Sequence, residues 1–480
     1  MNLIIANNAP NYYNFFIPLA DELKACEDVI FAVDSEYSKD YNHLNGYQSS
    51  VFSKFCKHFS GEYTPQEVYI ADRVRDMHGS WLLYPDADRD YYYGIFPKNT
   101  IIKKDELLEL LVAFFVRIFN KYKIKRVFYE NASNALALVA REVGSHFDVK
   151  YYGIAISRLP GRIALTDDWR EESHKYASLF EKIRDGSVSL SNDCLSYVGD
   201  YLENFSEIQP DYMKNNQLNN VSLIDKYVRF DKFELLSKKL WFSFQNNDWN
   251  FQVGNPFKVA ISSGLRNLKR SIKLRLLKGY FENFSSDLNE KYFLYPLHFH
   301  PEASTSVLAR EYGSEYEVIR NIAYSLPSGI KLYIKDHVSA CGFPTLAFYN
   351  KLKKLPNVRV INSSAPTKEM IKSSLGVFTL TSTVGYEALL LGKPVAIFGR
   401  VFYEFHDNCR KIETLSEVAA VMKEFILESK PPSIEYTVDF VSAYYMGTEQ
   451  VSINYNNQER SVQRDSARQI LRIIFESQRK

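Results

Sequence analysis

The stretch TLTSTVGYEALLLGKPVAIFGRVFY, residues 379–403, has the pattern of a strand, a tight loop, a helix, a turn and a second strand. An apolar run at 376–380 ends in hydroxyl residues and a glycine, a helix-like run follows at 386–391, and a Gly-Lys-Pro turn leads into the apolar run 395–398. This alternation predicts a βαβ crossover in a parallel sheet. The loop 381–385 would place hydroxyls and backbone N–H groups at a helix N-terminus, which favours an anion such as a nucleotide phosphate.

Four residues of this stretch are candidates for nucleotide binding. Ser382, Thr383 and Gly385 are expected to contact the phosphate, and Glu387 is expected to accept hydrogen bonds from ribose hydroxyls. The alternative is an ordinary crossover in which the hydroxyl residues only cap the helix. Other segments of the chain must distinguish these two interpretations.

The same alternation of strands and helices occurs on both sides of a different central region. Two Rossmann-like doubly wound domains facing a cleft are therefore expected, which is an α/β fold with the layout called GT-B in glycosyltransferases. The tyrosine-rich segment 84–97 is expected to be a surface loop. The expected boundaries are 1–168 for the first domain, on the acceptor and sugar side, 169–285 for a largely helical connecting region, 286–430 for the second, nucleotide-binding domain and 431–480 for a helical tail.

Length and composition indicate a well-packed protein of more than one domain. The 480 residues are 46% apolar and 15% aromatic, which excludes a disordered chain or a fibre. A formal net charge of +2 provides no overall field that would attract nucleic acid, so no nucleic-acid partner is expected. The five cysteines lack CxxC and Cys/His ligand spacing, which favours a reducing cytoplasm. Neither a cleavable signal peptide nor a membrane span is expected.

Polar side chains also follow two other strands of the second predicted domain. The motif YPLHFHPEAST carries His300, Glu302 and Ser304 after one strand, and IKDH carries Lys335 and His337 after the next. A fixed cation and an imidazole would form charge-assisted hydrogen bonds with a phosphate. The Lys-Asp-His group alone is more typical of a solvated strand end. Because three successive strand ends carry polar groups on one edge, we expect them to bind one ligand.

The two neighbouring histidines also require a test for metal binding. His298 and His300 at alternate positions of a strand would share one face, and a carboxylate lies close by. No third ligand at suitable spacing follows them. We therefore expect no metal and no cofactor at this strand end, and packing of the strand end by its histidines is the structural alternative.

Together, YPLHFHPEAST, IKDH and TSTVGYEALLLGKPVAIFGRVFY resemble the capsule polysaccharide biosynthesis family, whose members include the retaining β-Kdo transferases. The resemblance covers residues 292–403, and the sequence departs from it at Val338, where proline is usual. It implies a GT-B fold, a CMP-activated 3-deoxy-ulosonic or related acidic sugar as donor, no required metal, and transfer onto a surface glycan. The residues that it implies for the nucleotide side are His300, Glu302, Lys335, His337, Ser382, Thr383 and Glu387.

The chemistry of such a donor agrees with these residues. A CMP leaving group carries one phosphate, which a helix N-terminus with Lys335 and His337 would stabilise, whereas a diphosphate more often requires a divalent ion. Operation without a metal is therefore expected.

The sugar is expected to meet the first domain, where Glu130 directly follows the strand 126–129. A carboxylate there would serve as a nucleophile in a double displacement or as a general base in a single one. The alternative is an acid that only favours the start of the next helix. Asp167 and Asp168 are rival catalytic acids in this domain, and His300 is the catalytic candidate of the other domain.

The segment that follows the next strand, ISRLPGR, contains two arginines. Arg158 and Arg162 offer guanidinium groups suited to bidentate binding of a sugar carboxylate.

The basic segment LRNLKRSIKLRLLK, residues 265–278, contains no acidic residue. Helical spacing places Leu265, Leu268, Ile272 and Leu276 on one face, with arginine and lysine around the rest. Such a helix fits an anionic membrane surface, and a solvated or partner-binding helix is the alternative. RNA binding is not expected because no aromatic residues are interleaved with the charge.

The sequence thus predicts a cytoplasmic glycosyltransferase, peripheral at the inner face of a membrane, that uses a CMP-activated acidic sugar as nucleotide sugar donor. Its expected acceptor is a surface polysaccharide or a lipid-linked glycan. The alternatives are a transferase with a UDP- or GDP-sugar donor, a nucleotide-sugar epimerase of similar shape, and a non-catalytic glycan-binding scaffold subunit.

Overall fold

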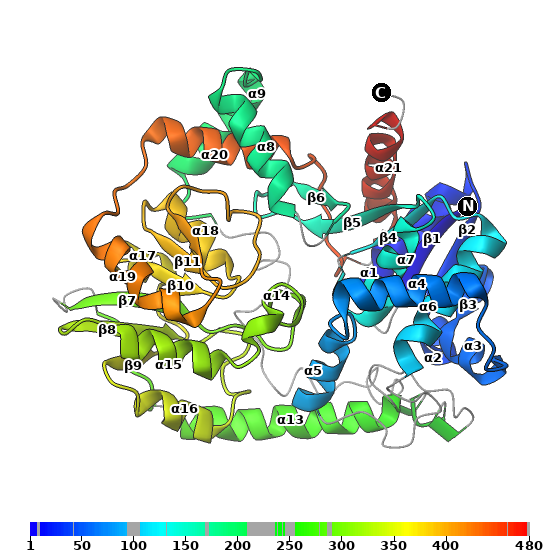
Figure 1. Ribbon diagram of the computed structural model, residues 1–480, viewed down its shortest axis with the longest axis horizontal. Coiled ribbons are helices and arrows are strands. Elements are labelled where there is room, and N and C mark those ends of the chain that lie inside the picture. Colours follow the sequence, from blue (N-terminus) through cyan, green and yellow to red (C-terminus); the bar gives the residue numbers. More distant parts are fainter. Residues whose placement is uncertain are drawn as a thin grey trace. The chain divides into compact units, whose positions relative to one another are not determined.

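The computed structural model describes residues 1–6, 10–41, 43–93, 106–130, 132–168, 172–208, 236–237, 239–241, 243–244, 255–277, 279–285, 290–457 and 459–477. The chain forms two compact units, and the elements of each are labelled in Figure 1. The N-terminal unit comprises Met1–Trp169, Gln209–Ser263 and Thr448–Lys480. The C-terminal unit comprises Arg170–Ile208 and Gly264–Gly447.

The N-terminal unit contains a six-stranded sheet in the order β3-β2-β1-β4-β5-β6. Five strands are parallel, and β6 is antiparallel to β5. Counted along the chain, the order 3-2-1-4-5-6 is that of a Rossmann fold. The strands are β1 (Asn2–Ala6), β2 (Val29–Val33), β3 (Ser49–Val51), β4 (Arg126–Tyr129), β5 (Lys150–Ile156) and β6 (Ile163–Thr166).

Helices with apolar faces accompany this sheet. The helix α6, LLELLVAFFVRIFNKY, is buried along most of its length, as its apolar composition requires. The helix α4 begins at a capping box, in which Thr64 and Glu67 each bond the other's backbone N–H, with Pro65 as the first helical residue. The bounds are α1 (Pro10–Lys24), α2 (Glu36–Tyr41), η1 (Leu44–Gly46), α3 (Phe52–His58), α4 (Pro65–His78), α5 (Tyr84–Tyr93), α6 (Leu107–Tyr122), α7 (Ala135–Ser145) and α21 (Arg460–Ser477).

The end of the chain returns to the N-terminal unit. Figure 1 shows α21 beside the strands of this sheet, and α21 packs against α1 in one apolar core with β1, β2 and β4. The Tyr455 hydroxyl donates to the Ile154 carbonyl at 2.7 Å, and Glu449 pairs with Ile163 of β6 through two backbone hydrogen bonds. The tail is thus part of this unit's core.

The C-terminal unit contains a second six-stranded sheet, in the order β12-β11-β10-β7-β8-β9, with all neighbouring strands parallel. This is again the order 3-2-1-4-5-6 along the chain. The central strands are buried at almost every position, as expected for a parallel sheet covered on both faces. The strands are β7 (Lys291–Pro296), β8 (Ile330–Lys335), β9 (Val358–Ile361), β10 (Val377–Thr379), β11 (Val395–Ile397) and β12 (Cys409–Lys411).

Two kinds of helix accompany the second sheet. Crossover helices connect its strands. Both α8 and α9 pack on α20, with a cluster of aromatic rings that includes Tyr176, Tyr386 and Tyr444. The helix α13 begins in the N-terminal unit and continues into this one. The bounds are α8 (Glu172–Arg184), α9 (Asn192–Glu203), α13 (Pro256–Leu276), α14 (Ala303–Ser306), η3 (Arg310–Tyr312), α15 (Glu315–Ser325), α16 (Leu346–Lys353), α17 (Thr367–Ser373), α18 (Thr383–Leu390), η4 (Leu415–Glu417), α19 (Val418–Leu427) and α20 (Ile434–Met446).

The two sheets confirm the fold class of two Rossmann-like doubly wound domains. The surface loop expected at 84–97 is wrong, because Tyr84–Tyr93 forms α5, and the remainder lies outside the described residues. Of the region 169–285, α8 and α9 belong to the C-terminal unit. The segment 431–480 is shared, since α20 belongs to the C-terminal unit and α21 to the N-terminal unit.

Candidate active site

The three polar strand ends are neighbours in the C-terminal sheet. Their strands lie in the order β10-β7-β8 and run parallel, so their carboxyl ends meet at one edge. The strand order reverses between β7 and β10, and ligands of doubly wound sheets bind outside the carboxyl ends at such a switch point. The residues after these strands therefore surround the position at which this fold holds a ligand.

A buried histidine joins the ends of β7 and β10. His298 Nε2 accepts a hydrogen bond from the Thr381 backbone N–H at 3.2 Å and lies 3.2 Å from the Thr379 hydroxyl oxygen. Nδ1 therefore carries the proton, which it donates to Glu315 Oε1 at 2.8 Å. The same oxygen accepts from the His298 backbone N–H at 3.1 Å and from the Tyr295 hydroxyl at 3.2 Å. His298 and Glu315 thus fix the loop that precedes α18.

The expectation that both histidines lie on one face of a strand is wrong. The strand β7 ends at Pro296, so neither His298 nor His300 has a strand neighbour to alternate with. His298 is buried in the network just described, whereas His300 is half-buried. The sequence analysis did not identify Glu315, which is the first residue of α15 and does not follow a strand.

The segment after His300 forms a short helical turn at the same edge. Glu302 is exposed, and its backbone N–H donates to the Thr305 hydroxyl at 3.1 Å. Ser304 is half-buried, and its carbonyl accepts a hydrogen bond from the Thr381 hydroxyl at 2.8 Å. Of the expected residues after β7, Ser304 is therefore in direct contact with the loop after β10.

The helix α18 begins at this edge. Ser382 is its N-cap, and the Ser382 hydroxyl accepts a hydrogen bond from the Val384 N–H at 3.2 Å. The Ser382 carbonyl accepts from the buried Tyr403 hydroxyl at 2.6 Å. At Gly385 an added Cβ would lie 2.9 Å from Tyr403 Cζ, so only glycine allows this close approach. With the half-buried Thr383 as its first residue, this helix directs N–H groups and a partial positive charge toward the edge.

The end of β8 supplies the cation and the imidazole. Lys335 is buried, and its ammonium donates to the Ser363 carbonyl at 2.8 Å. Burial lowers the pKa of Lys335, and the carboxylates of Asp336 and Glu387 oppose this shift. His337 accepts a hydrogen bond from the Ser339 N–H on Nδ1 at 3.2 Å, which leaves Nε2 as a donor. Desolvation is the largest cause that lowers the pKa of His337, and the electrostatic effects of His298 and Lys335 lower it further. This imidazole is therefore neutral at pH 7.

Two buried polar groups support this strand end. Asp336 accepts a hydrogen bond from the Tyr349 hydroxyl at 2.6 Å and one from the His337 N–H at 2.8 Å. Burial raises the pKa of Asp336, and these hydrogen bonds oppose the shift. Asp336 therefore fixes the turn after β8 through its hydrogen bonds.

Glu387 lies one turn into α18, half-buried. Its carboxylate interacts electrostatically with Lys335 and with Lys368 of α17, whose pKa is lowered mainly by burial. Lys368 donates to the Ile208 carbonyl at 2.8 Å and to the Phe205 carbonyl, which attaches α17 to the chain after α9. An acid next to a fixed cation is thus present beside the helix N-terminus.

In the N-terminal sheet, Glu130 directly follows β4 and is half-buried. Burial raises the pKa of Tyr129, Tyr151 and Tyr455. The charge of Glu130 raises these pKa values further, and for Tyr151 it comes after the effect of Tyr129. Glu130 is thus at the carboxyl edge of this sheet, as its position after a strand predicts.

The other two candidate acids, Asp167 and Asp168, follow β6, which runs opposite to the other strands of this sheet. Because β6 is antiparallel, Thr166 at its end pairs with Gly153 in the middle of β5. Asp167 and Asp168 therefore continue away from the carboxyl edge that carries Glu130. Asp167 is exposed, and Asp168 accepts a hydrogen bond from Arg141 Nη2 of α7 at 2.6 Å.

The two arginines lie on the turn between β5 and β6, beyond the carboxyl end of β5. Arg162 is buried and donates to the Thr448 hydroxyl at 2.9 Å and to the Thr448 carbonyl at 2.6 Å. Arg158 is half-buried. Arg162 is thus occupied in holding the returning chain, whereas Arg158 is the more accessible of the two.

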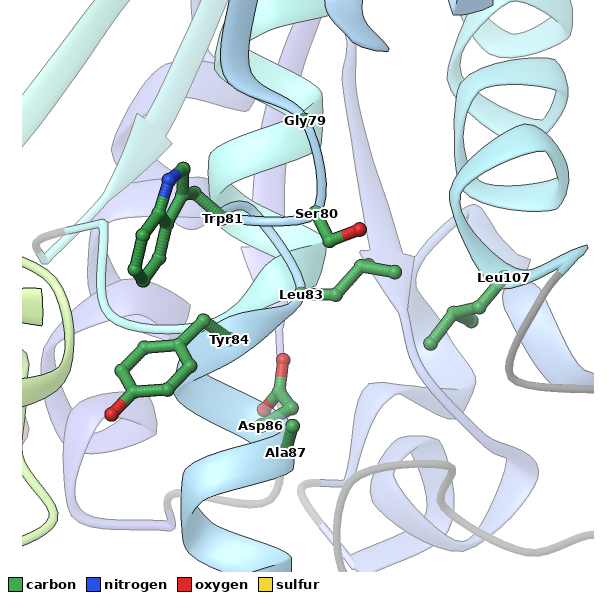
Figure 2. A pocket seen from close by; sticks show the side chains of 8 residues that line it. All are labelled: Gly79, Ser80, Trp81, Leu83, Tyr84, Asp86, Ala87 and Leu107. Atoms are coloured by element: carbon green, nitrogen blue, oxygen red, sulfur yellow. The ribbon is translucent and has the colours of Figure 1, made fainter. Parts of the chain in front are cut away.

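A mainly apolar pocket of about 450 Å³ lies in the N-terminal unit, next to the loop that follows β4. Figure 2 shows Trp81 and Tyr84 on one side of it, with ring centroids 5.4 Å apart, and Leu83 directed toward Leu107. Asp86 is buried at its base and accepts a hydrogen bond from the Ala135 N–H at the start of α7, at 2.6 Å. The lining residues are Gly79, Ser80, Trp81, Leu83, Tyr84, Asp86, Ala87 and Leu107.

The pocket is connected to the loop that carries Glu130. Arg89 pairs with Asp86 at 3.1 Å and also donates to the Ser133 carbonyl at 2.6 Å. Asn134 caps α7 through its side chain. The sequence pattern does not indicate this pocket, because the prediction for residues 84–97 is a surface loop.

The described residues contain neither a metal-binding cluster nor a helix able to cross a membrane. Over that part of the chain, no three His, Cys, Asp or Glu side chains are grouped so as to hold a metal ion. None of the described helices has both the length and the apolar content that crossing a membrane requires.

Comparison with known proteins identifies a family over part of the chain. A family model described as capsule polysaccharide biosynthesis protein matches residues 242–407, which confirms the resemblance found in the three motifs. No curated protein matches the chain.

Solved structures that resemble the chain include nucleotide-sugar enzymes. Thermosulfurimonas dismutans KpsC, a β-Kdo 2,4-transferase, is 12% identical, with 66% of this chain and 87% of that chain covered and a TM-score of 0.34. The β-Kdo 2,7-transferase KpsC of the same organism is 13% identical, with 80% and 87% covered and a TM-score of 0.33. The UDP-GlcNAc 2-epimerase from Neisseria meningitidis, bound to UDP-GlcNAc, is 11% identical, with 99% and 100% covered and a TM-score of 0.28.

Proposed function

We propose that this protein is a glycosyltransferase that transfers an acidic sugar, Kdo or a related ulosonic acid, from a CMP-activated donor to a surface polysaccharide or lipid-linked glycan. The observation that supports it best is the meeting of three strand ends at the switch point of the C-terminal sheet. One end supplies a helix N-terminus, one a buried cation and a neutral imidazole, and one the segment with His300.

In this proposal the phosphate of CMP binds at the start of α18. Ser382, Thr383 and Gly385 form the first turn there, whose partial positive charge attracts the phosphate. Lys335 adds an ammonium, which has three N–H donors, of which the Ser363 carbonyl takes one. His337 donates from Nε2 as a neutral imidazole. These donors stabilise the charge that develops on the departing CMP phosphate, which is why no metal ion is needed for this step.

The remaining groups of this edge bind the nucleoside and the reacting bond. Glu387, which interacts electrostatically with Lys335, accepts hydrogen bonds from the ribose hydroxyls. Glu302 and Ser304 complete the nucleotide side from β7. His300, on the same segment, is the catalytic candidate of this unit and acts on the leaving group as an acid.

The N-terminal unit binds the sugar and the acceptor in this proposal. Glu130 is the nucleophile or general base, because it alone among the three candidate acids stays at the carboxyl edge, whereas Asp167 and Asp168 run away from it. Arg158 binds the sugar carboxylate. The pocket beside Trp81 and Tyr84 accepts the apolar face of a sugar ring or the lipid part of an acceptor.

Nucleotide binding tests this proposal first. Calorimetric titration with CMP, UDP and GDP is expected to give the tightest binding with CMP. Lys335→Met is expected to weaken CMP binding about 10- to 150-fold, since hydrogen bonds to a charged group contribute about 1.5–3 kcal/mol. Lys331→Met is the matched control, because Lys331 lies on the same strand four residues earlier, about 13 Å from the edge.

Turnover tests the reaction itself. Release of CMP from CMP-Kdo in the presence of acceptor is expected for the parent protein, and Glu130→Gln is expected to abolish it while CMP affinity stays unchanged. Tighter binding of UDP or GDP would contradict the donor, as would an equal loss of CMP affinity in both lysine variants. CMP binding without turnover would instead favour the scaffold subunit, which keeps the site without the reaction.

A further inference from the structure

The helix α13 exposes its apolar row. Leu265, Leu268, Ile272 and Leu276 share one face by helical spacing, and their exposed fractions are 54%, 59%, 53% and 65%. A surface helix of a globular protein normally packs such a row against the core. In α13 the row is exposed, although four large apolar side chains in a line are costly to leave in water.

The opposite face attaches α13 to the C-terminal unit, and this face is basic. Arg270 Nε donates to the Cys341 carbonyl at 2.7 Å, and its guanidinium lies 4.4 Å from the ring centroid of Phe343. Lys273 donates to the Pro344 carbonyl at 2.6 Å and to the Phe343 carbonyl at 3.2 Å. These contacts set the rotation of the helix about its own axis, so the outward direction of the apolar row is fixed by bonding.

A close approach strengthens this attachment. Gly342 has a φ of 82°, and an added Cβ there would lie 3.0 Å from the side chain of Leu274. The segment 341–344 can therefore contact the helix closely only because it contains glycine at this position.

The charge around the exposed row has one sign. The helix contains no Asp or Glu over Pro256–Leu276, and Lys258, Lys269 and Arg275 are exposed along it. Lys278, which extends the basic sequence, lies outside the described residues. An apolar row bordered by lysine and arginine is complementary to the boundary between the acyl chains and the headgroups of an anionic lipid layer.

We propose that α13 is an interfacial helix that binds an anionic phospholipid membrane. The apolar row enters the acyl boundary, the exposed basic side chains contact the lipid phosphates, and Arg270 with Lys273 transmits the attachment to the C-terminal unit. This inference concerns the surface on which the protein works and does not depend on the reaction proposed above. Charge complementarity favours lipid over a second copy of the chain, since two copies would bring basic residues together.

Cosedimentation of the full-length protein with vesicles tests this inference. The parent protein is expected to bind vesicles of phosphatidylcholine with 30% phosphatidylglycerol and to show little binding to phosphatidylcholine alone. Leu268→Glu/Ile272→Glu is expected to lower the partition coefficient by at least tenfold. Lys269→Gln/Arg275→Gln is expected to lower it about 25-fold, or about fivefold for each basic side chain removed near the surface.

Two controls separate membrane binding from loss of fold. Leu427→Glu/Ile434→Glu adds the same two carboxylates at exposed apolar positions on other helices, with exposed fractions of 67% and 84%, and should keep vesicle binding. Thermal unfolding and CMP binding of the Leu268/Ile272 variant should equal those of the parent, because both side chains are exposed.

Three outcomes would overturn the inference. They are no vesicle binding by the folded parent, equal binding to both vesicle types, and unchanged binding by the Leu268/Ile272 variant. A parent that is dimeric by light scattering, is made monomeric by this variant and does not bind vesicles would assign the apolar row to a second copy of the chain.

Discussion

Gly385→Ala tests how the start of α18 is held in place. Gly385 is buried in the first turn of this helix, and an added methyl group would lie 2.9 Å from Cζ and 3.1 Å from Cε2 of Tyr403, and closer still to the hydroxyl. Tyr403 is only 1% exposed, so its ring has no room to withdraw. Its hydroxyl also donates the 2.6 Å hydrogen bond to the Ser382 carbonyl.

The expected effect follows from three contributions. Overpacking of a filled site costs about 1–3 kcal/mol. Loss of the Tyr403–Ser382 hydrogen bond costs a further ~1 kcal/mol. Alanine gains about 1 kcal/mol over glycine in a helix, which offsets part of this cost. The net expectation is that the free energy of unfolding falls by about 1–3 kcal/mol, with weaker CMP binding because the helix N-terminus moves.

Urea unfolding and CMP titration measure both effects. Gly199→Ala is the matched control, because Gly199 also lies in a helix, α9, and an added Cβ there has no heavy atom within 4 Å. That variant should be more stable than the parent by about 1 kcal/mol. Adding Tyr403→Phe to Gly385→Ala should recover part of the lost stability, since the closest atom is removed. If Gly385→Ala proved as stable as Gly199→Ala, the packing described around Tyr403 would be refuted.

Two further variants probe buried groups of the C-terminal unit. Glu315→Ala removes the acceptor shared by Tyr295 and His298 and should lower the free energy of unfolding by about 2–4 kcal/mol, with weaker CMP binding. Glu317→Ala, at an exposed site on the same helix, should change it little, and equal effects in urea unfolding would argue against the network. His406 is buried, its Nδ1 accepts from the Asn408 N–H at 3.0 Å, and burial lowers its pKa to about 3. The unfolded chain therefore binds a proton below about pH 6.5 that the folded chain does not, so stability is lost as pH falls, by about 2 kcal/mol from pH 7 to 5. His406→Gln, which keeps an acceptor, should lose this part of the pH dependence in unfolding measured at the two pH values, and an unchanged dependence would contradict the assignment.

The central strands could be predicted because each of them is marked by its own short run of apolar residues. The bounds expected for β4, residues 126–129, are those observed, and the apolar runs at 376–380 and 395–398 contain β10 and β11, since buried parallel strands are continuous apolar runs. The edge strands β3, β6 and β12 were not predicted, because their sequences SSV, IALT and CRK are short and two of them are polar. No sequence pattern indicates the antiparallel direction of β6, which makes the chain after Thr166 run opposite to the chain after β4.

The candidate site could be predicted where strand ends define it. Lys335, Ser382 and the segment with His300 are gathered by sheet order alone. The hydrogen bond between His298 and Glu315 could not be predicted from the sequence, since it depends on the angle at which α15 packs on β7. The helix α18 begins three residues before the expected run at 386, because its first turn is set by the Ser382 cap and not by apolar spacing.

The return of α21 to the first sheet has a consequence for biosynthesis. Phe15, Phe16 and Ile4 share their core with Ile470 and Ile474, which follow them in the chain by more than 450 residues. The opening Rossmann sheet is therefore translated hundreds of residues before the helix that covers it. Its apolar face stays uncovered during that interval and is a natural substrate for chaperones that bind nascent chains.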